Sequence, residues 1–78
     1  MTDQHSATDR YSCITLALMC ALEHEDELAM HVRAALRNGL TAADISEVFL
    51  QTAVYAGVPA ASSALKVAKA MLEQEGAL

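Results

Sequence analysis

The chain has 78 residues, enough for one small domain, and 54% of them are hydrophobic. One layer of short helices cannot bury so many hydrophobic side chains, so we expect further burial between the subunits of a homo-oligomer. The net charge of −5, with only five scattered lysines and arginines, argues against nucleic acid or an anionic membrane as a partner. The chain shows no basic leader segment and no bilayer-length apolar stretch in its first half, which predicts a cytoplasmic protein.

The first predicted element follows a polar N-terminal tail. Residues 1–8 show no hydrophobic periodicity and are expected to be disordered, whereas residues 9–78 are expected to form one helical domain. Asp9 is suited to cap a first helix that extends to about Leu22. Because this segment is apolar on all sides, we expect the helix to be buried on all sides.

A second helix is predicted from about Glu25 to Arg37, since acidic residues at its start and arginines at its end suit the helix dipole. Gly39 is placed to end it in a left-handed conformation. Thr41 and Asp44 then match a variant of the capping box, which predicts the start of a third helix.

The third helix, predicted over about 42–56, carries hydrophobic residues on two opposite faces, which implies two packing partners. Gly57 ends it, and Pro59 suits the first turn of a fourth helix with one apolar face. We therefore predict an all-α fold, a short antiparallel bundle of about four helices.

Three side chains with useful chemistry share one edge of the second helix: His24, Glu27 and His31. Glu27 and His31 are four residues apart and close enough to share a proton, and a carboxylate partner favours the protonated imidazole that a general acid requires. A solvated surface pair is the simpler alternative. A metal site is the less favoured alternative, because three ligands on one helix rarely converge without a fourth from elsewhere.

Weaker candidates lie on the first and third helices. Gln51 and Tyr55 share one edge, where an amide and a phenol could orient a substrate; a packed tyrosine with a solvated hydroxyl is the alternative. Ser12 is a hydroxyl in an apolar helix, where such groups usually bond to their own backbone. Cys13 and Cys20 are too far apart along a helix for a disulfide and are expected to be reduced thiols.

Three segments in order, residues 27–41, 45–48 and 51–61, resemble the carboxymuconolactone decarboxylase family of the AhpD-like superfamily. The resemblance implies an AhpD-like helical fold assembled as a trimer or hexamer. Family members usually carry further N-terminal helices, so the chain is similar to a short member. In the peroxidase branch a Cys-x-x-Cys pair precedes the histidine that matches His31; here His24 and Glu27 take those positions, which favours the decarboxylase branch.

The resemblance implies a cofactor-independent decarboxylation of 4-carboxymuconolactone, a small anionic lactone of the protocatechuate branch of aromatic catabolism. His31 would donate the proton and Glu27 would orient it. The implied pocket residues are Ser12, Gln51 and Tyr55. A non-catalytic oligomeric helical module and an acid–base enzyme of this fold on another small carbonyl compound are the alternatives.

Overall fold

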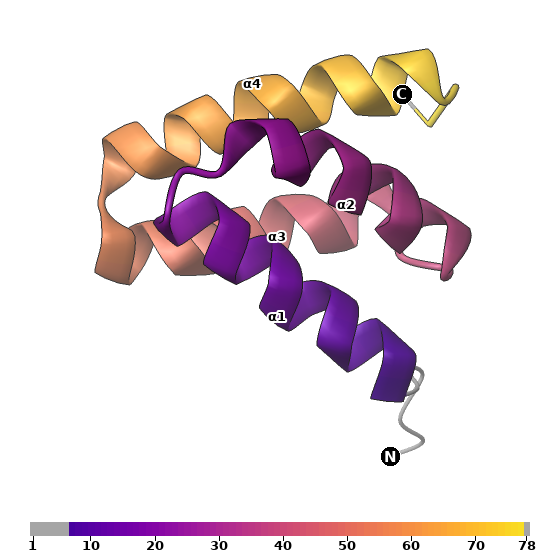
Figure 1. The fold of residues 1–78 in the computed structure, drawn as a ribbon, viewed down its shortest axis with the longest axis horizontal. Helices are drawn as coiled ribbons and strands as arrows, with labels where there is room; N and C mark the ends of the chain where they lie inside the picture. The colour runs from indigo at the N-terminus through magenta and orange to yellow at the C-terminus, as the bar shows by residue number, and fades with distance from the viewer. Residues whose placement is uncertain (1–6, 78) are drawn as a thin grey trace.

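Four α-helices make up the part of the chain that the computed structural model describes, residues 7–77. They are α1 (Ala7–Ala21), α2 (Glu25–Arg37), α3 (Ala42–Ala56) and α4 (Val58–Gln74). Successive helices run in alternating directions, and α1 and α4 each pack against both α2 and α3 (Figure 1). The predicted all-α bundle is therefore confirmed. No helix of the described part has the length and hydrophobicity needed to span a bilayer.

The first helix already includes residues 7–8, which the sequence assigned to the disordered tail. α1 starts at Ala7, so Asp9 lies in its first turn rather than at its cap, and its side chain is buried. Residues 1–6 of the predicted tail lie outside the described residues. A carboxylate in the first turn still interacts favourably with the positive end of the helix dipole.

The turn between α2 and α3, residues 38–41, follows the sequence prediction closely. Gly39 has a φ of +103°, and its backbone N–H donates to the Leu36 carbonyl oxygen while that of Leu40 donates to Ala35, the two bonds of a Schellman motif. The Thr41 hydroxyl then accepts from the Asp44 backbone N–H at 3.1 Å, and the Asp44 carboxylate accepts from the Thr41 N–H at 2.9 Å. This is the predicted capping box, and it satisfies the donors at the start of α3.

The turn between α1 and α2, residues 22–24, uses the same backbone motif with a different residue. Its N–H groups at Glu23 and His24 donate to the carbonyl oxygens of Cys20 and Met19. The left-handed position is occupied by Glu23, with a φ of +58°, and the N-cap His24 makes no side-chain bond to the start of α2. A left-handed residue other than glycine costs about 1–2 kcal/mol, so this turn is strained.

The core lies between the four helices and takes residues from each of them. Its largest fully buried side chains are Phe49, Leu16, Leu28, Ile45, Val32 and Cys20. One face of α2, with Leu28, Val32 and Ala35, is buried in this core. On one side of that face α2 meets α4, and Arg33 Nε forms an ion pair with Glu75 Oε2 at 3.3 Å. The opposite edge of α2 is therefore the one turned toward α1.

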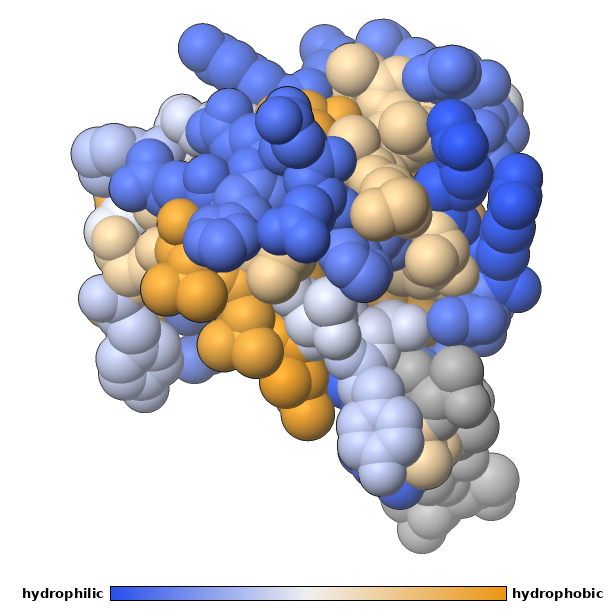
Figure 2. Space-filling view, in the orientation of Figure 1, coloured by the Kyte–Doolittle hydropathy of each residue, from blue (hydrophilic) through white to orange (hydrophobic). Residues whose placement is uncertain are grey.

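The prediction that α1 is buried on all sides is wrong for the single chain. Tyr11, Ile14, Leu18 and Leu22 recur at helical spacing on one side of α1, and each is more than half exposed. Figure 2 shows the row of hydrophobic side chains that follows this helix. The helix has apolar residues all round, but within the described residues its packing is mainly against α2 and α3, with a smaller contact to α4. The exposed α1 face therefore stays in contact with solvent.

Candidate functional site

The edge of α2 that carries the predicted acid–base pair begins at the strained α1–α2 turn. His24 Nδ1 and Glu27 Oε1 are hydrogen-bonded at 3.0 Å, with side chains 50% and 58% exposed. Glu27 thus pairs with His24, three residues before it. The sequence suggested a pair with His31, four residues after it. Both spacings bring side chains together on a helix, and the rotamer of Glu27 selects the earlier one.

His31 is half-buried, and the contacts two turns later show what this edge of α2 faces. Asn38 lies seven residues after His31, which places both on the same edge of the helix. Its side-chain amide donates to the Ser12 hydroxyl of α1 at 3.2 Å. Ser12 and His31 therefore border the same seam between α1 and α2, which we call the α1–α2 seam. The Ser12 hydroxyl thus accepts a hydrogen bond from the residue that caps the C-terminus of α2.

Asn38 is a further candidate site residue, which the sequence pattern did not single out. Its distance of two helical turns from His31 was visible in the sequence, but its position at the end of α2 favoured a purely structural role. The bond to Ser12 shows that its amide reaches α1. An amide and a hydroxyl can orient polar atoms of a substrate. Along α2 they lie about 10 Å from His31, since seven residues rise about 1.5 Å each.

Gln51 and Tyr55 lie on the other side of α1. Gln51 lines a shallow hollow between α1 and α3, together with Cys13 and Ile14. Tyr55 is 84% exposed. Because α1 stands between this hollow and the α1–α2 seam, one chain does not bring these two residues together with His31.

A second hollow, of about 440 Å³, lies at the α1–α2 turn. It is lined by Glu23, His24, Glu25, Asp26 and Glu27. Four carboxylates around one imidazole repel an anion, so this hollow does not suit an anionic substrate. Within residues 7–77, no group of three or more histidine, cysteine and acidic side chains is arranged to hold a metal ion.

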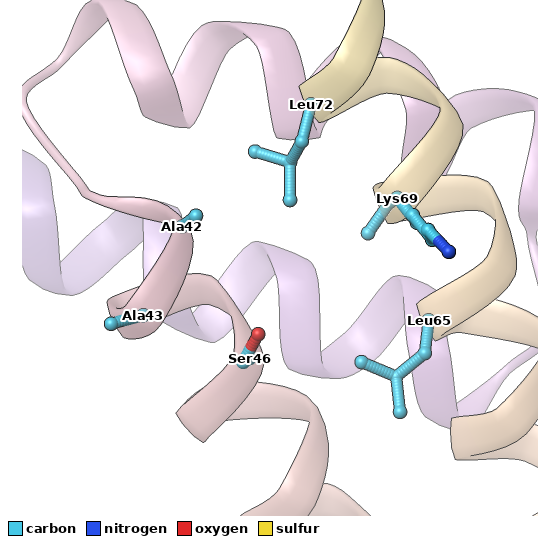
Figure 3. Close-up of a pocket in the computed structure, with 7 residues that line it drawn as sticks. Ala42, Ala43, Ser46, Leu65, Lys69 and Leu72 are labelled. Atoms are coloured by element: carbon cyan, nitrogen blue, oxygen red, sulfur yellow. The ribbon is translucent and has the colours of Figure 1, made fainter. Parts of the chain in front are cut away.

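A third hollow, also of about 440 Å³, lies between α3 and α4 (Figure 3). Its lining contains none of the predicted site residues. The residues around it are Ala42, Ala43, Ser46, Leu65, Ala68, Lys69 and Leu72. It is thus a separate feature of the fold.

The two cysteines are free thiols, as predicted. The Cys20 thiol is buried and donates to the Ala60 carbonyl oxygen at 3.8 Å, whereas Cys13 is half-buried in the hollow between α1 and α3. Burial raises the pKa of both thiols, and the nearby carboxylates of Asp44 and Glu23 add to the effect on Cys13 and Cys20 respectively. Thiols with raised pKa values are poor nucleophiles at neutral pH.

Comparison with known proteins shows the family of this chain. The profile of the carboxymuconolactone decarboxylase family matches residues 7–70. The chain belongs to that family. It is 40% identical over 65 residues to a 4-carboxymuconolactone decarboxylase of Acinetobacter baylyi, covering 83% of this chain and 48% of the relative.

A second relative is the nitrosuccinic acid decarboxylase npaB of Metarhizium robertsii. It is 39% identical over 56 residues, which cover 72% of this chain and 39% of the relative. The chain therefore spans half or less of the length of these curated relatives. Both relatives carry the name of a decarboxylase.

Proposed function

We propose that this chain is a cofactor-independent decarboxylase of small carboxylic acids, of the 4-carboxymuconolactone type, with His31 as the proton donor. The family match supports the reaction class. The observation that carries the site is the α1–α2 seam, where a half-buried imidazole shares one helix edge with the amide of Asn38, hydrogen-bonded to Ser12.

The substrates named for the two relatives ask for the same chemistry. In nitrosuccinic acid a nitro group sits on a carbon that bears a carboxyl group, and in 4-carboxymuconolactone the electrons of the departing carboxylate can spread onto the lactone carbonyl. In each case the bond from carbon to carboxylate breaks, carbon dioxide leaves, and the electron pair moves onto an electron-withdrawing group. One proton must then be delivered to carbon.

This chain offers groups for each part of that reaction. The imidazolium of His31 donates the proton and recovers one from solvent, since histidine is the side chain best suited to proton transfer near neutral pH. The Asn38 amide and the Ser12 hydroxyl, which are hydrogen-bonded to each other, would orient polar substrate oxygens.

The proposed site on the α1–α2 seam must be shielded from solvent. We propose that further copies of the chain shield it in a closed homo-oligomer, a trimer or hexamer. The exposed α1 face borders the α1–α2 seam and has no charged residue among its four large side chains. A subunit packed on this face would bury it and shield the seam from water, which strengthens electrostatic stabilisation inside a site.

The test of the activity is carbon dioxide release from 4-carboxymuconolactone and from nitrosuccinic acid by the full chain. His31→Ala and His31→Gln should lower turnover on the accepted substrate by about 10²–10⁴-fold, the usual cost of losing a positioned acid. His24→Gln is the matched control, and it should lose less than about tenfold because its imidazole is solvent-exposed. Full turnover in both His31 variants would remove the assigned role.

The test of assembly is the mass in solution by light scattering. Leu18→Glu places a charge in the middle of the exposed α1 face and should dissociate the oligomer. Ala70→Glu, at an exposed position of α4, serves as the control and should leave the mass unchanged. A monomeric parent chain at micromolar concentration would contradict the proposed assembly.

A further inference from the structure

The third hollow described above, between α3 and α4, has the size of a small-molecule site, and we call it the groove (Figure 3). Its volume of about 440 Å³ falls within the range of roughly 300–1,000 Å³ that is typical of ligand pockets. None of its lining residues lies on the α1–α2 seam. Any ligand here is therefore independent of the activity proposed above.

The lining is apolar except for two groups. Leu65 and Leu72 of α4 point into the space between the helices, the hydroxyl of Ser46 faces the same space from α3, and Lys69 lies along the α4 rim (Figure 3). Alanines complete the walls, and no carboxylate contributes to them. The groove thus combines an apolar body with one hydroxyl and one positive charge.

The ammonium group of Lys69 has no acidic partner within residues 7–77. The ion pairs at the ends of α2 use other residues, and Glu73, one turn further along α4, is not paired with Lys69. Lys69 differs from Lys66, which also lacks an ion pair in the described residues, because it lines the groove. An uncompensated positive charge beside an apolar groove is complementary to an anion that carries an apolar group.

We propose that this groove binds a small monocarboxylate with a compact apolar body of about six to ten carbons. The body packs against Leu65, Ala68 and Leu72, and the carboxylate accepts hydrogen bonds from the Lys69 ammonium and the Ser46 hydroxyl. A dicarboxylate fits poorly, because its second charge would be desolvated against the alanine walls without a partner. The groove therefore selects a different class of acid from the two dicarboxylic substrates considered above.

The test uses three ligands of one shape and different charge: 3-phenylpropionate, 3-phenylpropan-1-ol and 3-phenylpropylamine. Each is titrated into the full chain while NMR follows the backbone amides of Ala42, Ala43 and Ser46. We expect the carboxylate to bind with a Kd on the order of 1 mM, the alcohol about three- to tenfold more weakly, and the amine most weakly. Equal affinity for acid and alcohol would overturn the role of the charge.

Variants locate the binding. Lys69→Gln should abolish the preference for the acid over the alcohol, whereas Lys66→Gln, which removes an exposed lysine outside the groove, should retain it. Ala43→Leu should weaken all three ligands by filling the mouth of the groove, with circular dichroism confirming the fold. If the three amides shift with protein concentration and ignore the ligands, a second copy covers the groove and the proposal is wrong.

Discussion

The two turns that flank α2 have the same backbone and different residues. Both close the preceding helix with the paired hydrogen bonds of a Schellman motif. The α2–α3 turn places Gly39 in the left-handed position and caps the next helix with Thr41, whereas the α1–α2 turn uses Glu23 and has no side-chain cap. One turn is built for stability, and the other keeps a strained residue where glycine would fit better.

The strained turn is the one next to the candidate site. Glu23 precedes His24, whose imidazole bonds to Glu27 on the edge that continues to His31. Backbone strain is often retained at functional sites, where the surrounding structure holds it in place. The comparison therefore predicts that stability requires glycine at position 39 and would gain from glycine at position 23.

Gly39→Ala should give the largest loss of stability among the turn variants. A side chain at a φ of +103° is strained although no neighbour lies within 4 Å, so we expect a loss of about 1–2 kcal/mol in the free energy of unfolding. Urea denaturation measures it. Glu23→Ala is the control and should change little, because position 23 already has a side chain; an equal loss at both positions would contradict the comparison.

Thr41→Ala should cost about 1 kcal/mol, since it removes the hydroxyl that accepts from the Asp44 backbone N–H. Thr41→Ser keeps that acceptor and should retain most of the stability in the same denaturation experiment. If serine and alanine were equally destabilising, the capping bond would not be the source of the effect.

Glu23→Gly should stabilise the chain by about 0.5–1 kcal/mol, because glycine relieves the left-handed strain while adding some entropy to the unfolded state. Thermal unfolding of the parent and the variant gives the sign. No gain, with Glu23→Ala also neutral, would show that position 23 carries no strain.

The cysteines should give the smallest effects. Because burial raises both thiol pKa values, alkylation at pH 7 should be slow, and slower for buried Cys20 than for half-buried Cys13. Mass spectrometry after timed iodoacetamide treatment measures the two rates. Blocking Cys13 should leave decarboxylation within a few-fold of the parent; complete loss would point to thiol chemistry.

The sequence predicted the local structure well because local rules determine it. The bounds of α2 and α3, the left-handed Gly39 and the capping box depend on residues a few positions apart. The capping box of Thr41 and Asp44 involves only groups within one turn, so neighbouring helices cannot alter it.

The sequence could not predict which partners distant groups choose. The bond from Asn38 to Ser12 and the ion pair of Arg33 with Glu75 join residues far apart in the chain, and nothing local indicates them. The choice of Glu27 between His24 and His31 depends on a rotamer. The burial of α1 was overestimated for a similar reason. Its apolar sequence shows that the helix has hydrophobic side chains on all sides, but not which other helices pack against each side.

The central claim is that His31 serves the reaction rather than the fold, and one paired measurement tests it. Turnover and the free energy of unfolding are both measured for His31→Gln and for Thr41→Ala. The account predicts that His31→Gln loses about 10²–10⁴-fold in turnover with stability unchanged, while Thr41→Ala loses about 1 kcal/mol of stability with turnover unchanged. If His31→Gln kept its turnover, or lost it only in proportion to unfolding, the assignment of His31 would be contradicted.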